Sequence, residues 1–88
     1  MSERTKLALK ADISSILYES PLKALFTKEI AFELRRDKEF AKILLLEMEK
    51  EHLVERVNKN GVGVFYKRRT KWKIPNHLLK IYSKNEHD

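Results

Sequence analysis

The chain has 88 residues, of which 36% are charged and 42% are hydrophobic, and it carries a formal net charge of +6 and no cysteine. This length and composition predict one small ordered domain over residues 1–88, on the globular side of the boundary with disordered chains. The absence of cysteine excludes disulfides, thiolate metal sites and cysteine nucleophiles.

Membrane and secretion signals are also missing from the sequence. No segment approaches the about 18 consecutive apolar residues of a membrane helix, and no long apolar run follows the N-terminal residues as in a signal peptide. We therefore expect a cytoplasmic protein that does not enter a membrane. The abundance of Lys and Glu without any Gln is typical of thermophile proteins, and a thermophilic archaeal source is one interpretation.

Basic residues outnumber acidic ones by 19 to 13, and the pI is about 9.7. Lys and Arg bind a polyanion favourably because they release the counterions condensed on it, so nucleic acid is a natural partner. The alternative interpretation is a Lys-rich surface that only keeps the protein soluble.

Apolar residues at helical spacing predict an amphipathic first helix from about residue 3 to residue 19, with Leu9, Ile13, Ile16 and Leu17 as its apolar residues. Pro21 ends this helix, because a residue that precedes proline is disfavoured in the helical conformation. The loop that follows is expected to carry three apolar side chains toward the core, Leu22, Leu25 and Phe26.

A short second helix and a tight turn come next. Thr27 is predicted to cap this helix, which ends near Arg36. Asp37 is predicted to cap a third helix after almost no connection, so the two helices must cross at a steep angle. This arrangement is that of a helix-turn-helix.

The third helix is predicted from residue 38 to residue 52. Two ion pairs are expected on its surface, Glu39 with Lys42 and Glu47 with Lys50. At about 100° per residue, one face gathers the side chains expected in the core, which are Phe40, Ala41, Leu44, Leu45 and Met48. The opposite side carries a stripe with the spacing i, i+4, i+7, i+11, formed by Glu39, Ile43, Leu46 and Lys50.

The two apolar residues of this stripe leave three interpretations open. Ile43 and Leu46 could contact thymine methyl groups in DNA, or they could dock a partner helix or a second copy of the chain. In the third interpretation, a C-terminal helix folds back over both side chains and they belong to the core.

A strand, turn and strand are predicted after the third helix. Residues 53–58 and 62–69 are rich in β-branched and aromatic residues and are joined through Asn60 and Gly61, a strong signal for a type I′ hairpin turn. A longer loop would shift the register. With a two-residue turn, the predicted cross-strand pairs are Val57 with Val64 and Glu55 with Tyr66.

Cations gather where the chain leaves this hairpin, at Lys67, Arg68, Arg69, Lys71 and Lys73. They are expected to contact phosphates, and the alternative is an edge strand that charge keeps from pairing with other chains. Trp72 could stack on bases, but its position favours an anchor for a terminal helix that Pro75 begins and that runs to about residue 84.

Residues 47–56, Glu-Met-Glu-Lys-Glu-His-Leu-Val-Glu-Arg, resemble the end of the recognition helix and the start of the wing in winged-helix regulators of the multiple-antibiotic-resistance and arsenic-repressor type. Met48 stands at a leucine position of this pattern, and residues 53–56 match it directly. Residues 27–31, Thr-Lys-Glu-Ile-Ala, are similar to the opening of the family's second helix. The resemblance covers about residues 5–74, and His52 stands where the family usually has glycine.

The resemblance implies an α+β, mostly helical, winged helix-turn-helix fold with three helices, a β-hairpin wing and an extra C-terminal helix. It implies that the third helix enters the DNA major groove, that the hairpin lies along the backbone or the minor groove, and that dimers form through terminal helices. The exposed face of the third helix has little Arg, Asn or Gln, the usual readers of base edges. The DNA-binding candidates are Arg35, Arg36, Lys38, Lys42, Lys59, Asn60, Lys67, Arg68, Arg69 and Lys71, and the groove-facing stripe adds Glu39, Ile43 and Leu46.

Catalysis is not predicted, because the carboxylates are scattered and no serine has a base nearby in the pattern. The three histidines, His52, His77 and His87, lack metal-ligand spacing, so no metal or cofactor is expected. We predict a nucleoid-associated protein that binds double-stranded DNA as a small transcription regulator or chromatin-associated factor, homodimeric through its first and C-terminal helices. The alternative is a non-catalytic protein-interaction winged helix, an accessory subunit of a replication or transcription complex.

Overall fold

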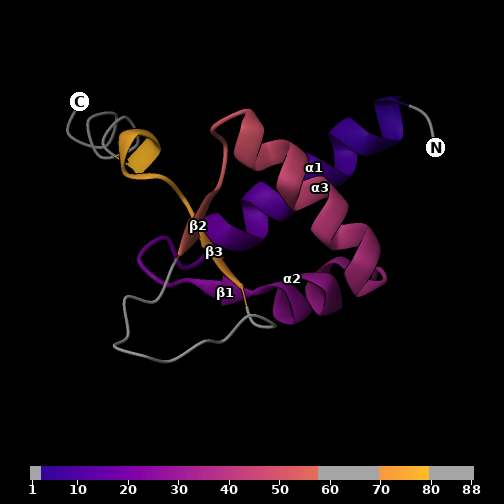
Figure 1. The fold of residues 1–88 in the computed structure, drawn as a ribbon, viewed down its shortest axis with the longest axis horizontal. Helices are drawn as coiled ribbons and strands as arrows, with labels where there is room; N and C mark the ends of the chain where they lie inside the picture. Colours follow the sequence, from indigo (N-terminus) through magenta and orange to yellow (C-terminus); the bar gives the residue numbers. More distant parts are fainter. Residues whose placement is uncertain (1–2, 58–69, 80–88) are drawn as a thin grey trace.

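A computed structural model describes residues 3–57 and 70–79 of the chain. Along the chain, a strand follows the first helix, two further helices come next, and two more strands follow them. The strands form a small sheet that lies beside the three helices (Figure 1). The elements are α1 (Glu3–Tyr18), β1 (Leu25–Phe26), α2 (Thr27–Leu34), α3 (Lys38–Lys50), β2 (Glu55–Val57) and β3 (Lys71–Lys73). The boundaries of the first three predicted helices agree with the structure to within two residues at each end.

The core lies where the three helices meet the sheet. Ile13 and Leu17 of α1, with Leu44 and Leu45 of α3, are at most 1% exposed. The predicted core face of α3 is confirmed, with Phe40 half-buried at its edge. The other buried apolar residues are Leu9, Ile30, Ala31, Leu34, Ala41, Met48, Val54, Trp72 and Ile74.

The loop between α1 and α2 differs from its prediction. Leu22 is 91% exposed, so it does not reach the core. Leu25 and Phe26 are half-buried because they form β1, an edge strand that the sequence did not predict. Two residues are too few to give an alternating pattern, and only the long-range pairing with β3 defines this strand.

The three strands form an antiparallel sheet in the order β1-β3-β2. The predicted hairpin register is wrong, since Val57 pairs with Lys71 and Glu55 with Lys73. Burial explains this register, because Trp72 and Ile74 are each 1% exposed and must face the core. The Asn60-Gly61 turn and the predicted strand over residues 62–69 lie outside the described residues.

Thr27 begins α2 but does not cap it, contrary to the prediction. The N-cap position is Phe26, whose backbone N–H donates to Oε1 of Glu29 at 2.8 Å. The Thr27 hydroxyl instead accepts a hydrogen bond from Nε1 of Trp72 at 2.8 Å, and Thr27 is only 5% exposed. Trp72 therefore anchors the first turn of α2, whereas the sequence predicted an anchor for the terminal helix. Asn76–Leu79 form a helical turn after Pro75, and the rest of the predicted C-terminal helix lies outside the described residues.

Candidate nucleic-acid interface

The connection between α2 and α3 presents two cations. Arg35 takes a left-handed conformation with φ of 59°, and the backbone N–H of Arg36 donates to the carbonyl of Ala31 at 3.0 Å. This pattern ends α2 abruptly, as in a Schellman motif. Asp37 caps α3 as predicted, by accepting from the backbone N–H of Phe40 at 3.4 Å. Both arginine side chains are exposed as a result.

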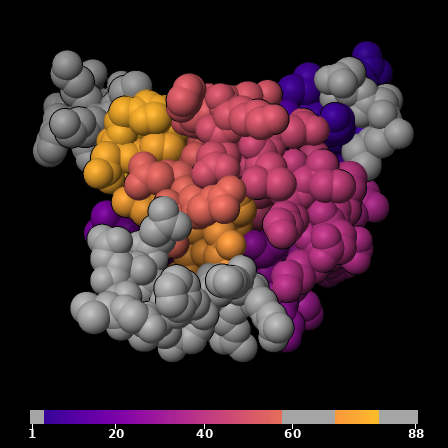
Figure 2. Space-filling view, viewed as in Figure 1, coloured from indigo at the N-terminus to yellow at the C-terminus, as the bar shows by residue number. Residues whose placement is uncertain are grey.

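The outer face of α3 is exposed along its first half and at its end. Figure 2 shows α3 and the segment that follows it across the middle of one face of the molecule. The exposed residues are Lys38, Glu39, Lys42, Ile43 and Lys50, and Ile43 is 53% exposed. Leu46 is half-buried and packs against the core, so the predicted stripe is not continuous. Ile43 is therefore the apolar residue of the stripe that remains free to contact DNA or a partner.

An ion-pair cluster joins α1 to the end of α3. Glu47 accepts from Nζ of Lys6 at 3.1 Å and lies 3.0 Å from Nζ of Lys10, which also lies 3.2 Å from Glu51. The predicted pairing of Glu47 with Lys50 is therefore wrong, because two lysines of a neighbouring helix reach this carboxylate. The predicted pair of Glu39 with Lys42 is also absent from the ion pairs of the described residues. The hydrogen bond to Glu47 raises the pKa of Lys10, and the hydrogen bonds from Lys10 and then Lys6 lower the pKa of Glu47.

Arg56 on β2 holds the end of α3 against the sheet. Its Nε and Nη2 donate to the two carboxylate oxygens of Glu49 at 3.2 and 2.9 Å. Its guanidinium carbon also lies 5.3 Å from the centroid of the Trp72 ring. Such a bidentate, ring-stacked arrangement fixes orientation better than a single contact. Arg56 therefore couples α3, β2 and β3.

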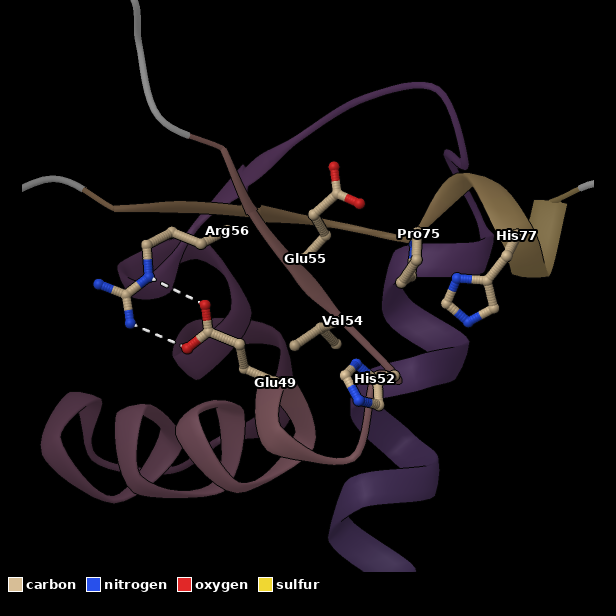
Figure 3. A pocket seen from close by; sticks show the side chains of 7 residues that line it. All are labelled: Glu49, His52, Val54, Glu55, Arg56, Pro75 and His77. Atoms are coloured by element: carbon tan, nitrogen blue, oxygen red, sulfur yellow. Dashed lines mark hydrogen bonds and ion pairs between the residues drawn. The ribbon is translucent and has the colours of Figure 1, made fainter.

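A shallow hollow of about 580 Å³ lies beside this contact (Figure 3). Figure 3 shows the Arg56–Glu49 pair on one side of the hollow, and His52 and His77 on the other, near Pro75. No group of three His, Asp or Glu side chains with metal-binding geometry occurs among the described residues. Because Arg56 already occupies the Glu49 carboxylate, the hollow does not offer that group to a ligand.

The structure brings together the helical members of the predicted DNA-binding set. Arg35, Arg36, Lys38 and Lys42 lie exposed on the turn and the outer face of α3. Lys71 lies apart from them on β3, with its Nζ 4.7 Å from the centroid of the Phe26 ring. Lys59, Asn60, Lys67, Arg68 and Arg69 lie outside the described residues.

Sequence reasoning missed four structural contacts that fix this surface. The Lys6 and Lys10 pairs with Glu47, the Arg56 pair with Glu49 and the Trp72 bond to Thr27 join residues 7 to 45 positions apart. A helical or strand periodicity does not reveal partners on different elements. The charges themselves were visible, but their pairing depends on how α1, α3 and the sheet pack.

The described fold is a winged helix-turn-helix: a tight turn joins α2 to a basic α3, and a small sheet follows. The sequence matches no family model and no curated protein. None of the helices in the described ranges could span a membrane.

The fold is similar to MepR of Staphylococcus aureus, solved in complex with DNA, with a TM-score of 0.64 and 19% identity over 89% of this chain. A MepR mutant bound to an oligodeoxyribonucleotide gives a TM-score of 0.66 and 20% identity over 90% of the chain. A third structure is that of MepR as a transcription regulator of the S. aureus multidrug efflux pump MepA. It has a TM-score of 0.61 and 20% identity over 90% of this chain. The chain spans 65%, 59% and 59% of those MepR chains, respectively. These likenesses establish the fold.

Proposed function

We propose that this protein binds double-stranded DNA and acts as a small transcription regulator or chromatin-associated factor without catalytic activity. One observation carries the proposal: the cations of the turn and of the outer face of α3 have no ion-pair partner among the described residues. These cations are Arg35, Arg36, Lys38 and Lys42. The acidic groups Glu47 and Glu49 at the other end of α3 are bound to Lys and Arg of α1 and β2.

This distribution of charge suits a helix that approaches a polyanion. In the proposed complex, the first half of α3 enters the major groove, and Arg35 and Arg36 contact phosphates beside it. The basic residues from Lys67 to Arg69 contact the backbone from the wing, together with Lys59 and Asn60. MepR, which has this fold, has been solved bound to DNA, and the likeness supports the same kind of ligand here.

Duplex affinity measured at about 50 and 200 mM salt tests the proposal. The turn variant combines Arg35→Asn, which tolerates the left-handed conformation, with Arg36→Gln. We expect it to bind every duplex sequence more weakly and to flatten the slope of log affinity against log salt by about 2, one for each lost phosphate contact. A control with the same charge change, Arg4→Gln with Lys23→Gln, alters exposed cations on α1 and on the loop that follows it.

The control variant should keep the salt slope of the unaltered protein. An equal loss in both variants would mean that only net charge matters, and the interface would have to be placed elsewhere. Failure of the unaltered, folded protein to bind any duplex at low salt would reject the DNA proposal. The protein-interaction alternative would then be favoured, with Ile43 as its exposed apolar contact.

We also propose a homodimer formed through α1 and the helix that begins after Pro75. Leu7 on α1 is 64% exposed, so this helix offers an apolar side chain to a second copy of the chain. Sedimentation velocity of Leu7→Lys should show a monomer, whereas Leu22→Lys, at an exposed leucine of the following loop, should leave the dimer intact. A monomeric unaltered protein would refute this assembly.

A further inference from the structure

The carboxylates on α3 and just after it differ in whether they have a cationic partner. Glu47, Glu49 and Glu51 each have a cationic partner within 3.2 Å, supplied by α1 or β2. Glu39, in the first turn of α3, has no such partner among the described residues, and it is exposed. The unpaired carboxylate therefore stands on the part of α3 that carries Lys38 and Lys42.

An unpaired carboxylate on this face opposes binding unless DNA supplies a hydrogen-bond donor. The phosphates repel it, and a carboxylate at neutral pH can only accept hydrogen bonds. In the major groove, the base groups that donate are the 4-amino group of cytosine and the 6-amino group of adenine. Guanine presents two acceptors there, and thymine presents an acceptor and a methyl group.

We propose that Glu39 is a specificity-determining residue that selects cytosine, by accepting a hydrogen bond from its 4-amino group in the major groove. Cytosine is favoured over adenine because adenine N7, an acceptor beside its amino group, repels the second carboxylate oxygen. The inference rests on the proposed DNA-binding function and gives it a base preference. It also explains how a helix with little Arg, Asn or Gln on its outer face can still discriminate among sequences.

Lys42 lies one turn along the same face, at the i+3 position from Glu39, and it is also exposed. An ammonium group binds the O6 and N7 acceptors of guanine. Since guanine pairs with cytosine, the two side chains can recognise opposite strands of one base pair or of two adjacent pairs. The preferred site is therefore expected to contain a C·G pair at a fixed position.

Selection of bound duplexes from a random-sequence pool tests this assignment, with the unaltered protein and two variants. Glu39→Gln should exchange the cytosine for adenine, because a glutamine amide pairs with N6 and N7 of adenine. On the selected site, this variant should lose about 5-fold to 150-fold in affinity. Glu33→Gln makes the same charge change on α2, at an exposed carboxylate facing α1, and should keep the cytosine.

The outcomes separate this inference from the function on which it rests. The inference is supported if the duplexes selected by Glu39→Gln lose the fixed cytosine and those selected by Glu33→Gln keep it. Salt-dependent binding without a fixed cytosine, or with the same preference in Glu39→Gln, overturns the role of Glu39 and leaves DNA binding intact. Absence of binding by the unaltered protein at any salt concentration overturns both.

Discussion

A single buried hydrogen bond joins Trp72 on the central strand to Thr27 at the start of α2. The indole Nε1 donates to the threonine Oγ1 at 2.8 Å, and both residues are at most 5% exposed. The Thr27 hydroxyl also lies 3.4 Å from the carbonyl of Thr70. The hydroxyl thus serves tertiary packing, and the sheet sets the position of the helix that precedes the proposed DNA-binding turn.

Replacement of Thr27 by valine keeps the shape of the side chain but leaves the indole N–H buried without an acceptor. We expect Thr27→Val to lower the free energy of unfolding by about 1–3 kcal/mol. Urea unfolding followed by tryptophan fluorescence measures this, because Trp72 is the only tryptophan. Thr27→Ser keeps the hydroxyl and should lose clearly less; an equal loss in both variants would contradict the account.

His52 ends α3 in a conformation that suits glycine. Its φ is 63°, and the backbone N–H of the next residue, Leu53, donates to the carbonyl of Met48 at 2.9 Å. A side chain makes the left-handed region less favourable, although histidine tolerates it better than β-branched residues do. The glycine at this position in the resembled regulators has the same physical explanation.

The variant His52→Gly should therefore raise the free energy of unfolding by up to about 1 kcal/mol, after the greater entropy of glycine in the unfolded chain is deducted. His52→Val should lower it, because a β-branched residue fits this region poorly. Chemical denaturation of the three proteins gives the order directly. A glycine variant less stable than the unaltered protein would contradict this prediction and would mean that the histidine side chain contributes contacts that outweigh its backbone cost.

At the scale of elements, α1 and α3 are joined by charge as well as by apolar packing. The raised pKa of Lys10 means that its contribution to stability is complete below its ordinary pKa of about 10.4 and is lost as pH rises through the folded value. The lowered pKa of Glu47 means that its contribution is complete above about 4.3 and is lost as pH falls through the folded value.

We therefore expect the ion-pair cluster to stabilise the protein most between about pH 5 and pH 10. Glu47→Gln should lower the Tm within this window, and the difference from the unaltered protein should shrink in acid. High salt should also reduce the difference, because these side chains are partly exposed. Thermal melts across pH test this, with Glu33→Gln as the control; a constant difference at all pH values would contradict it.

The elements differ in how far the sequence predicts them. The three helices follow from periodicity, from Pro21 and from the Asp37 cap, which are local signals. The register of the sheet does not follow from local signals. The burial of Trp72 decides it, and the Asn-Gly turn signal carries no information about burial. Similarly, the position of Leu46 on the helix suggested exposure, but packing against the core half-buries it.

Like the fold, the candidate site could be predicted from the sequence only in part. The exposed cations of the turn and of α3 could be read from the sequence, since a short connection between two amphipathic helices leaves their outer sides free. The ion pairs at the other end of α3 could not be read from the sequence, because Lys10 and Arg56 reach their acidic partners only in the folded structure. The lack of a cationic partner distinguishes Glu39 from the other carboxylates of α3, and this difference is visible only when their partners among the described residues are known.

At the scale of the whole molecule, a net charge of +6 is distributed unevenly around α3. Its first half and the preceding turn present cations that have no ion-pair partner in the described part of the chain, whereas its second half is held by α1 and by Arg56. This arrangement leaves one end of the helix available to a ligand and fixes the other end to the body of the protein. The central claim is that the free end is the DNA-binding surface.

Titration of the ¹⁵N-labelled protein with a short duplex, followed by amide chemical shifts, tests that claim most directly. The account predicts the largest shifts at Arg35 and Arg36 and across the first half of α3, with small changes in the first turn of α1. These shifts should shrink as salt is added. Shifts confined to α1, or no shifts from a folded protein at low salt, would contradict the claim that this end of α3 binds DNA.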